Sequence, residues 1–330
     1  MMKKLFIVFG GIVLLLVLVI VGGMAYLQTA FPKVSPAPSF TIDQTPERVA
    51  RGEYLVKHVM ACLDCHSEKN RAFYSQPIVP GTEGKGGKMF PGVPGKLYMP
   101  NITPAALSSW TDGQILHSIT AGVGKDGEPL APMMPFTEYR YLSKQDAAAI
   151  VAYLRSMPAI SNEQPIPESS LNFPLNLIFR TIPKDPEPSA QPDPAEKVAV
   201  GKYLTQIAGC KFCHTQMVQG KMAEGMEFAG GHEFPVPDYG TTRSANITPD
   251  DETGIGDWDE DDFIGMFKTF ADSMGRQIPV KIGEKQTEMP WTLYAGMTEE
   301  DLSAIYAYLQ TVKPVKNEVE IFTPTDEEVR

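Results

Sequence analysis

Length, composition and charge limit the class of protein. The chain has 330 residues, of which 43% are hydrophobic, and its 40 acidic and 29 basic residues give a formal net charge of −11. This length allows two domains of ordinary size besides a membrane anchor. The negative charge argues against binding to nucleic acid or to an anionic lipid surface, and it suits either a basic protein partner or simple solubility.

The first predicted element is a membrane anchor. Two lysines precede an uncharged apolar run over residues 5–27, which is long enough to cross a bilayer as a helix. A cleaved signal peptide is the alternative, but its apolar core is usually shorter, and no clean small-x-small cleavage site follows Met24. No cysteine lies near the end of the run, which excludes a lipoprotein anchor. We predict an uncleaved, single-pass anchor over residues 1–30.

The charges beside the anchor predict its orientation. Lysines that flank a membrane-spanning helix stay in the cytoplasm. The chain after Phe31 is therefore expected outside the cytoplasm, in the periplasm of a cell with two membranes. A linker over residues 31–44 would join the anchor in the cytoplasmic membrane to the folded part.

The rest of the chain is an internal duplication with an offset of about 148 residues. Each half opens with a cap residue and a proline that predict a helix start, and matched sequences follow in the same order. The last match has an offset of 155, so seven residues are inserted between Trp258 and Met289. The matched pairs are Thr45-Pro46 with Asp193-Pro194, 52–55 with 201–204, 101–104 with 246–249, Trp110 with Trp258, and 134–139 with 289–294.

A capped helix is predicted at the end of each half. Ser143-x-x-Asp146 precedes an amphipathic stretch that ends at Ser156, and Thr298-x-x-Asp301 precedes one that ends at Gln310. The two halves therefore have the same order of elements. Long irregular loops are expected between their helices because the chain contains 28 glycines and 29 prolines.

These matches predict the domain organisation. We expect a mainly α-helical protein with tandem domains over residues 45–158 and 193–314, followed by a C-terminal tail over residues 315–330. The segment 159–192 between the domains is rich in proline and is expected to be an extended connector. Its apolar middle, residues 171–179, is expected to pack across the junction of the two domains.

Two Cys-x-x-Cys-His sequences use every cysteine of the chain. This motif is the attachment signature of c-type haem. Residues three apart lie on one face of a helical turn, so both thiols can meet the two vinyl groups of one porphyrin, and the next residue supplies an imidazole to the iron. The motifs predict two covalently bound haem c groups, held by Cys62, Cys65 and His66 and by Cys210, Cys213 and His214.

Two other interpretations of these cysteines are weaker. Disulfides between cysteines three apart are usually strained and redox-active, and they do not explain the histidines. A zinc site needs four ligands close together, whereas the two pairs lie 148 residues apart, each within its own repeat. The haem interpretation accounts for all six residues.

A second axial ligand is expected for each iron if the protein only carries electrons. A methionine thioether in this position raises the reduction potential. Met134 and Met289 occupy matched positions on a loop just before the closing helix. Met133 lies beside Met134, but only Met134 matches Met289 in the repeat. We predict Met134 and Met289 as the sixth ligands, together with His66 and His214 as the proximal ligands.

Three histidines lie outside the two motifs. His58 and His117 belong to apolar-rich helical stretches, where packed or surface histidines are the expected interpretation. His232 is an alternative to Met289 as a ligand in the second half. The first half has no histidine at the corresponding place, so we favour Met289.

The chain resembles the membrane-anchored multihaem cytochrome c subunits of periplasmic alcohol and aldehyde dehydrogenases. The resemblance spans nearly all of residues 45–314. It implies a tandem pair of class I cytochrome c-like helical domains. The first half lacks the Thr-Gly-Ile-Gly element, and the chain has two haem motifs where those subunits typically have three. The sequences that carry the resemblance are 246–249, Thr253 to Gly256 with Trp258, Met289 to Trp291, and Tyr306 to Leu309.

This resemblance implies an electron-transfer protein with no catalytic residues of its own. The expected partners are the lipid bilayer and a redox protein, either a dehydrogenase or a quinol-oxidising complex as donor and a terminal oxidase as acceptor. The alternative is a dihaem enzyme, such as a peroxidase, in which one iron keeps an open position. Both halves keep a matched methionine, which favours the carrier.

An acidic stretch over residues 250–262 contains eight acidic residues and no basic one. It would either steer a basic redox partner or form a solvated loop whose last acids, residues 259–262, stabilise a helix start. We favour the second interpretation because acidic residues gather at helix N-termini without any partner.

Overall fold

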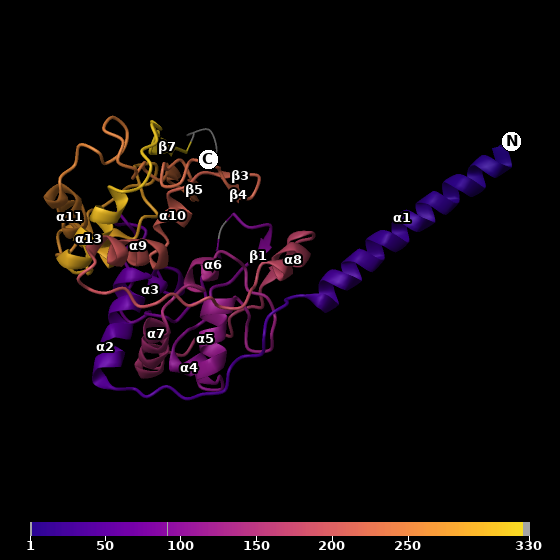
Figure 1. Cartoon of the computed structure of the whole chain (residues 1–330), viewed down its shortest axis with the longest axis horizontal. Helices are drawn as coiled ribbons and strands as arrows, with labels where there is room; N and C mark the ends of the chain where they lie inside the picture. The colour runs from indigo at the N-terminus through magenta and orange to yellow at the C-terminus, as the bar shows by residue number, and fades with distance from the viewer. Residues whose placement is uncertain (1, 91, 326–330) are drawn as a thin grey trace.

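The structure is a computed structural model that describes residues 2–90 and 92–325. One long helix, α1 (Met2–Ala30), extends away from two packed halves (Figure 1). Its mean hydropathy reaches 3.2 over 18 residues, and none of that window is buried inside the protein. By length and composition α1 can cross a membrane, as the sequence predicts.

The foot of α1 is tied to the connector. The Arg180 guanidinium donates to the carbonyl oxygens of Leu27 (3.3 Å) and Phe31 (2.6 Å). These bonds satisfy carbonyls that the end of a helix leaves without partners. The orientation of α1 relative to the first half is therefore set partly by a residue about 150 positions away.

The apolar middle of the connector does not pack as expected. Strand β2 (Ser170–Leu171) pairs with β1 (Gly95–Lys96) of the first half, and α8 (Leu175–Ile178) and η2 (Phe179–Thr181) lie against α1. The prediction that residues 171–179 bridge the two halves is wrong. The segment instead lies beside α1 and the first half (Figure 1), with Leu177 buried and Phe173 and Ile178 exposed.

The first half is built on two crossing helices, α2 and α7. Thr45 caps α2 through a hydrogen bond to the backbone of Arg48, and Ser143 caps α7, so both predicted helix starts are confirmed. The helices cross at Gly52, where an added Cβ would lie 1.9 Å from the Ala149 carbonyl oxygen. The helical elements are α2 (Pro46–Tyr54), η1 (Leu55–Val59), α3 (Cys62–His66), α4 (Pro104–Leu107), α5 (Asp112–Ala121), α6 (Phe136–Tyr139) and α7 (Lys144–Ser156).

The second half repeats this arrangement with α9 and α13. These helices cross at Gly201, where an added Cβ would lie 1.7 Å from the Ala304 carbonyl oxygen. Thr298 caps α13 and Asp259 caps α11 through a capping box, as predicted. The helical elements are α9 (Lys197–Ile207), α10 (Cys210–Cys213), α11 (Glu260–Lys268), η3 (Gly275–Gln277), α12 (Trp291–Tyr294) and α13 (Glu299–Leu309).

The first helix of the second half begins later than the sequence predicts. Asp193 and Pro194 match a helix start, but α9 begins at Lys197. The Asp193 carboxylate instead accepts from the backbone of Ala195 (3.0 Å), and its carbonyl accepts from Glu196 (2.9 Å). Aspartate forms such turns readily, which delays the helix by one turn.

Short strands in the second half were not predicted. The hairpin β3 (Met217–Val218) and β4 (Lys221–Met222) follows the second cysteine pair. Strands β5 (Glu233–Val236), β6 (Gly240–Arg243) and β7 (Phe322–Pro324) form an antiparallel sheet in that order. The strand from the expected C-terminal tail therefore packs on the second half.

The two halves are joined by a reciprocal pair of tyrosines. Tyr54 of α2 donates to Asp301 (2.6 Å) at the start of α13. Tyr203 of α9 donates to Asp146 (2.8 Å) at the start of α7. Each tyrosine thus binds the cap of the other half's closing helix, and a single hydrophobic core cluster runs through both halves. These contacts give the pair of halves an approximate twofold arrangement.

Candidate haem sites

Both cysteine motifs follow a residue in the left-handed conformation. Ala61 precedes the first motif with φ 46°, and Gly209 precedes the second with φ 72°. The left-handed residue turns the chain out of the preceding helix and into the short helix of the motif. Glycine adopts this conformation freely, whereas alanine does so at a cost of about 1 kcal/mol. The same backbone turn therefore arises from two different residues.

The four cysteines are free and half-buried. Burial raises the pKa of Cys62 to about 12 and that of Cys65 to about 11, and burial likewise raises the pKa of Cys210 and Cys213 to about 12. A raised pKa disfavours the thiolate form that zinc binding needs. Among residues 2–90 and 92–325, no three or more His, Cys, Asp or Glu side chains cluster as a metal site would require.

Each motif histidine is held by one ring nitrogen. His66 Nδ1 lies 2.8 Å from the Pro100 carbonyl oxygen, and His214 Nδ1 lies 2.8 Å from the Ala245 carbonyl oxygen. A carbonyl can only accept, so Nδ1 carries the proton and Nε2 keeps its lone pair. Burial lowers the pKa of both imidazoles, which favours the neutral form. The residues therefore fit a proximal ligand to haem iron at both sites.

The Asn-Ile-Thr-Pro repeat holds these carbonyls in place. Asn101 follows Pro100 directly, and its side chain accepts from the backbone of Thr103 (2.8 Å) while donating to Ile160 (2.7 Å). Asn246, which follows Ala245, makes the equivalent bonds to Thr248 (3.0 Å) and Val315 (2.7 Å). The sequence shows this repeat, but its role in orienting the histidines emerges only from the fold.

Met134 and Met289 occupy equivalent positions in the two halves. Both are half-buried and pack against the core, and each precedes the short helix α6 or α12. Tyrosines at the ends of these helices tie the loops to the cysteine motifs. Tyr139 donates to the Met60 carbonyl (3.4 Å) and Tyr294 to the Ala208 carbonyl (2.9 Å), each two residues ahead of a motif.

The two motifs lie close to each other at the junction of the halves. The pKa of Cys213 is raised first by burial and then by the charges of Cys210 and Cys65, the latter from the other motif. Burial raises the pKa of Tyr139 as well, with contributions from cysteines of both motifs. The repeat alone gives no sign of this proximity.

A buried lysine lies between the two sites and was not singled out by the sequence. Lys69 Nζ is 3.0 Å from Asp64 in the first motif and 3.6 Å from Glu288, the residue before Met289. Burial acts to lower the pKa of Lys69, but the two carboxylates outweigh it and raise the pKa above its ordinary value. A lysine three residues after a motif resembles an ordinary surface residue, so no sequence signal marks it.

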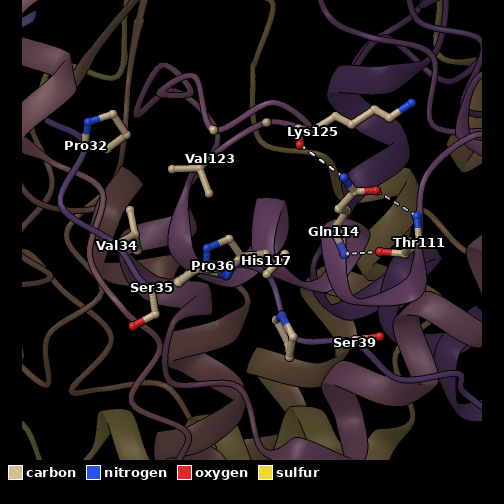
Figure 2. A pocket seen from close by; sticks show the side chains of 14 residues that line it. Pro32, Val34, Ser35, Pro36, Ser39, Thr111, Gln114, His117, Val123 and Lys125 are labelled. Atoms are coloured by element: carbon tan, nitrogen blue, oxygen red, sulfur yellow. Dashed lines mark hydrogen bonds between the residues drawn. The ribbon is translucent and has the colours of Figure 1, made fainter. Parts of the chain in front are cut away.

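Two of the remaining histidines are packed, as expected. His58 Nδ1 lies 2.9 Å from the Leu293 carbonyl of the other half. His117 is 7% exposed and borders a cavity of about 520 Å³ between α5 and the linker. Figure 2 shows this cavity, with His117 beside Pro36 and Ser39 of the linker. Neither histidine lies in a cysteine motif.

His232 lies close to the proximal histidine of the second site. Burial lowers the pKa of His214, and the charge of His232 lowers it further. The His232 ring lies 4.6 Å from that of Phe234. Gly230, two residues before His232, donates its N–H to the His214 carbonyl (2.8 Å). The choice of Met289 over His232 as the second axial ligand stays a prediction from the repeat.

Comparison with known proteins agrees with this geometry. Residues 49–158 match the cytochrome c family model. Over these residues the first half is similar to cytochrome c domains. The mainly helical fold and the apolar N-terminal helix that the sequence predicts are therefore confirmed, and haem c is the cofactor that such a domain implies. The domain boundaries, the second haem and the individual ligands stay predictions.

Relatives of the cytochrome c domain match across both halves. A gluconate 2-dehydrogenase cytochrome c subunit from Pantoea cypripedii is 28% identical over 84% of this chain and 63% of its own length. A quinone-dependent alcohol dehydrogenase cytochrome c subunit from Gluconacetobacter polyoxogenes is 27% identical over 82% and 58%. A diheme cytochrome c-type protein from Cereibacter sphaeroides is 26% identical over 91% and 97%.

These relatives differ from the chain in length. The chain spans only about three fifths of the two dehydrogenase subunits, whereas it covers nearly all of the diheme protein. The proteins that resemble it are named as cytochromes, in agreement with the expectation of an electron carrier. The shared segment contains both cysteine motifs of this chain.

Proposed function

We propose that the chain is a membrane-anchored dihaem cytochrome c that transfers electrons. The observation that carries this proposal is the duplicated histidine geometry, in which a carbonyl fixes Nδ1 of His66 and of His214 at the same distance. Bound haem c supplies an iron that alternates between the ferric and ferrous states. The chain supplies the attachment, the axial ligands and a buried environment.

The roles of the residues follow from their chemistry. The four cysteines form thioethers with the porphyrin vinyl groups, and His66 and His214 present Nε2 to the two irons. Met134 and Met289 would supply the second ligand to each iron. Their thioethers favour ferrous over ferric iron and so raise the potential. The burial of each motif favours the less charged reduced state in the same direction.

The location and partners follow from the anchor and the relatives. α1 holds the haem domains at the cytoplasmic membrane on the periplasmic side. Two relatives are named as cytochrome c subunits of gluconate and alcohol dehydrogenases. The donor in this proposal is a periplasmic or membrane dehydrogenase or a quinol-oxidising complex, and the acceptor is a terminal oxidase.

Purification from detergent-solubilised membranes tests this function. A dehydrogenase or oxidase subunit is expected to co-purify, and both oxidised haems are expected to be low-spin and unreactive toward cyanide and peroxide. A high-spin haem that turns over peroxide would show instead a dihaem enzyme with one open iron.

Met134→Ala is expected to leave both haems attached while the first site loses its thioether ligand. The site should become high-spin or bind an external ligand, and its potential should fall because methionine ligation raises it. Electron paramagnetic resonance and a redox titration measure both changes. Met133→Ala is the matched control and should change neither property. An unchanged Met134→Ala spectrum together with loss of the thioether ligand in Met133→Ala would assign the ligand to Met133 instead.

Electron transfer to the acceptor is expected to depend only weakly on salt. Most carboxylates of the acidic stretch already have partners within the chain: Asp250 binds Thr253, Glu252 binds Lys316, Glu260 binds Lys197, and Asp259 and Asp262 form a capping box. A docking patch would make the rate fall steeply as ionic strength rises. Stopped-flow measurement over a range of salt concentrations decides, and a steep fall contradicts the structural role.

A further inference from the structure

A loop of the first half reaches into the second half. We call residues 70–76 the clamp loop. The Tyr74 N–H donates to Ile278 (2.8 Å), and the Ala72 carbonyl accepts from Val280 (2.9 Å), so the loop pairs with the second half like a short strand. Tyr239 of the second half donates to the Arg71 carbonyl (2.5 Å). The clamp loop is thus anchored along its length by backbone contacts.

The segment that receives this loop lies in the part of the second repeat that contains the seven-residue insertion. The insertion falls between Trp258 and Met289, and residues 278–280 lie within that interval. Among the described residues, the backbone hydrogen bonds of residues 130–136, including Met134, stay within the first half. The two methionine loops therefore differ in what supports them.

Ser75 of the clamp loop forms hydrogen bonds to the backbone of Met289 and of Trp291. Its hydroxyl donates to the Met289 carbonyl (2.8 Å) and accepts from the Trp291 N–H (2.9 Å). Ser75 is 2% exposed, so these bonds are shielded from water. Its φ of 61° is rare for residues other than glycine, which shows that surrounding contacts hold it in place.

Two glutamines complete the contact. Gln286 is fully buried; its amide donates to the Phe73 carbonyl (3.0 Å), and its oxygen accepts from the Ser75 N–H (2.9 Å). Gln76 donates to Glu288 (2.8 Å). Residues 286–289 are therefore held from the first half on the side that precedes Met289. Side chains this buried exchange partners only when the local structure opens.

We propose that the clamp loop positions Met289 as an axial ligand, so that first-half residues set the strength of its bond to the second iron. This inference rests on the proposed function, which assigns Met289 to that iron. Ser75 acts here as a positioning residue, because it touches the backbone of the ligand loop and not the haem. The consequence is that the second iron's potential depends on a loop of the first half, so that loss of the Ser75 hydroxyl is expected to change the second potential and not the first.

Two substitutions separate the hydroxyl from the backbone strain. Ser75→Ala removes both hydrogen bonds and keeps the side chain's Cβ. Ser75→Gly removes the same bonds and also relieves the left-handed conformation, which glycine adopts freely. Both variants are expected to behave alike if the hydroxyl matters. Ser118→Ala is the matched control, because Ser118 bonds only within its own helix, to Ile115 (2.9 Å).

The holoprotein is measured in two ways. Hydrogen exchange at the Trp291 amide should accelerate about tenfold in both variants, on the order of one lost hydrogen bond. In a Met134→Ala background, the charge-transfer band from a thioether to ferric iron reports Met289 alone. The intensity of this band should fall when Ser75→Ala or Ser75→Gly is added. Without that background, the potential of the second haem should fall while that of the first stays constant.

The outcomes distinguish this inference from the proposed function. If the thioether band of the second site is present but unchanged in Ser75→Ala and Ser75→Gly, the positioning role is wrong and the ligand assignment stands. If the Met134→Ala protein itself lacks the band, Met289 is not a ligand and both ideas fail. Equal effects in Ser118→Ala would also overturn the specific role of Ser75.

Discussion

Gly201→Ala is expected to destabilise the second half by about 3 kcal/mol or more. An alanine Cβ would lie 1.7 Å from the Ala304 carbonyl oxygen and 2.4 Å from its carbon. Both atoms belong to the backbone of α13, so no side-chain rotation relieves the overlap, and α9 and α13 must separate. Overpacking of this kind typically costs 1–3 kcal/mol, and a backbone obstacle places it at about the upper end. Chemical denaturation of the detergent-solubilised holoprotein measures the effect.

Gly265→Ala provides the opposite case within the same half. Gly265 lies in α11, is exposed, and has no heavy atom within 4 Å of an added Cβ. Alanine should therefore stabilise the helix by about 0.5–1 kcal/mol through its lower backbone entropy. If Gly201→Ala and Gly265→Ala change the free energy of unfolding alike, the close crossing of α9 and α13 is incorrect.

Lys69→Met is expected to cost about 3 kcal/mol of folding stability. The Lys69 side chain is 2% exposed and lies within 3.0 Å of Asp64 and 3.6 Å of Glu288. Its removal leaves two neighbouring carboxylates without their cation, and breaking a buried pair in this way costs roughly 3–5 kcal/mol. The lower figure applies because Asp64 and Glu288 are 18% and 29% exposed. The variant should also lower both haem potentials, since a positive charge beside the two sites favours the reduced state.

Two further variants test the cause of this loss. Adding Asp64→Asn to Lys69→Met removes one unpaired carboxylate and should restore part of the stability. Lys316→Met is the surface control, because its pair with Glu252 is 65% and 70% exposed and is expected to contribute less than about 1 kcal/mol. A Lys69→Met protein as stable as the control would show that the buried charge cluster does not hold the two halves together.

The elements with local signals could be predicted from the sequence. Thr45, Ser143 and Thr298 cap helices as expected, because a cap is a contact between residues three positions apart. Asp193 carries the same signal yet forms a turn first, since aspartate satisfies either structure. Local chemistry identifies that a helix is near but not the residue at which it starts.

The contacts between the halves could not be predicted in this way. Tyr54 and Tyr203 fall in a matched sequence, but the repeat gives no indication that each binds the other half. Ser75 and Lys69 lie outside any motif. Their roles depend on how two duplicated units face each other, which local sequence patterns do not encode. The repeat places the candidate histidines and methionines twice, so the sequence alone allows these residues to be proposed as ligands.

The haem content of the purified protein tests the central claim most directly. A pyridine haemochrome assay, combined with the intact mass of the denatured chain, counts covalently attached haems. The account predicts two haem c groups per chain, with all four cysteines consumed as thioethers. A chain that carries one haem or none when expressed with a functional haem-attachment system, or that keeps Cys210 and Cys213 as free thiols or a disulfide, would contradict it.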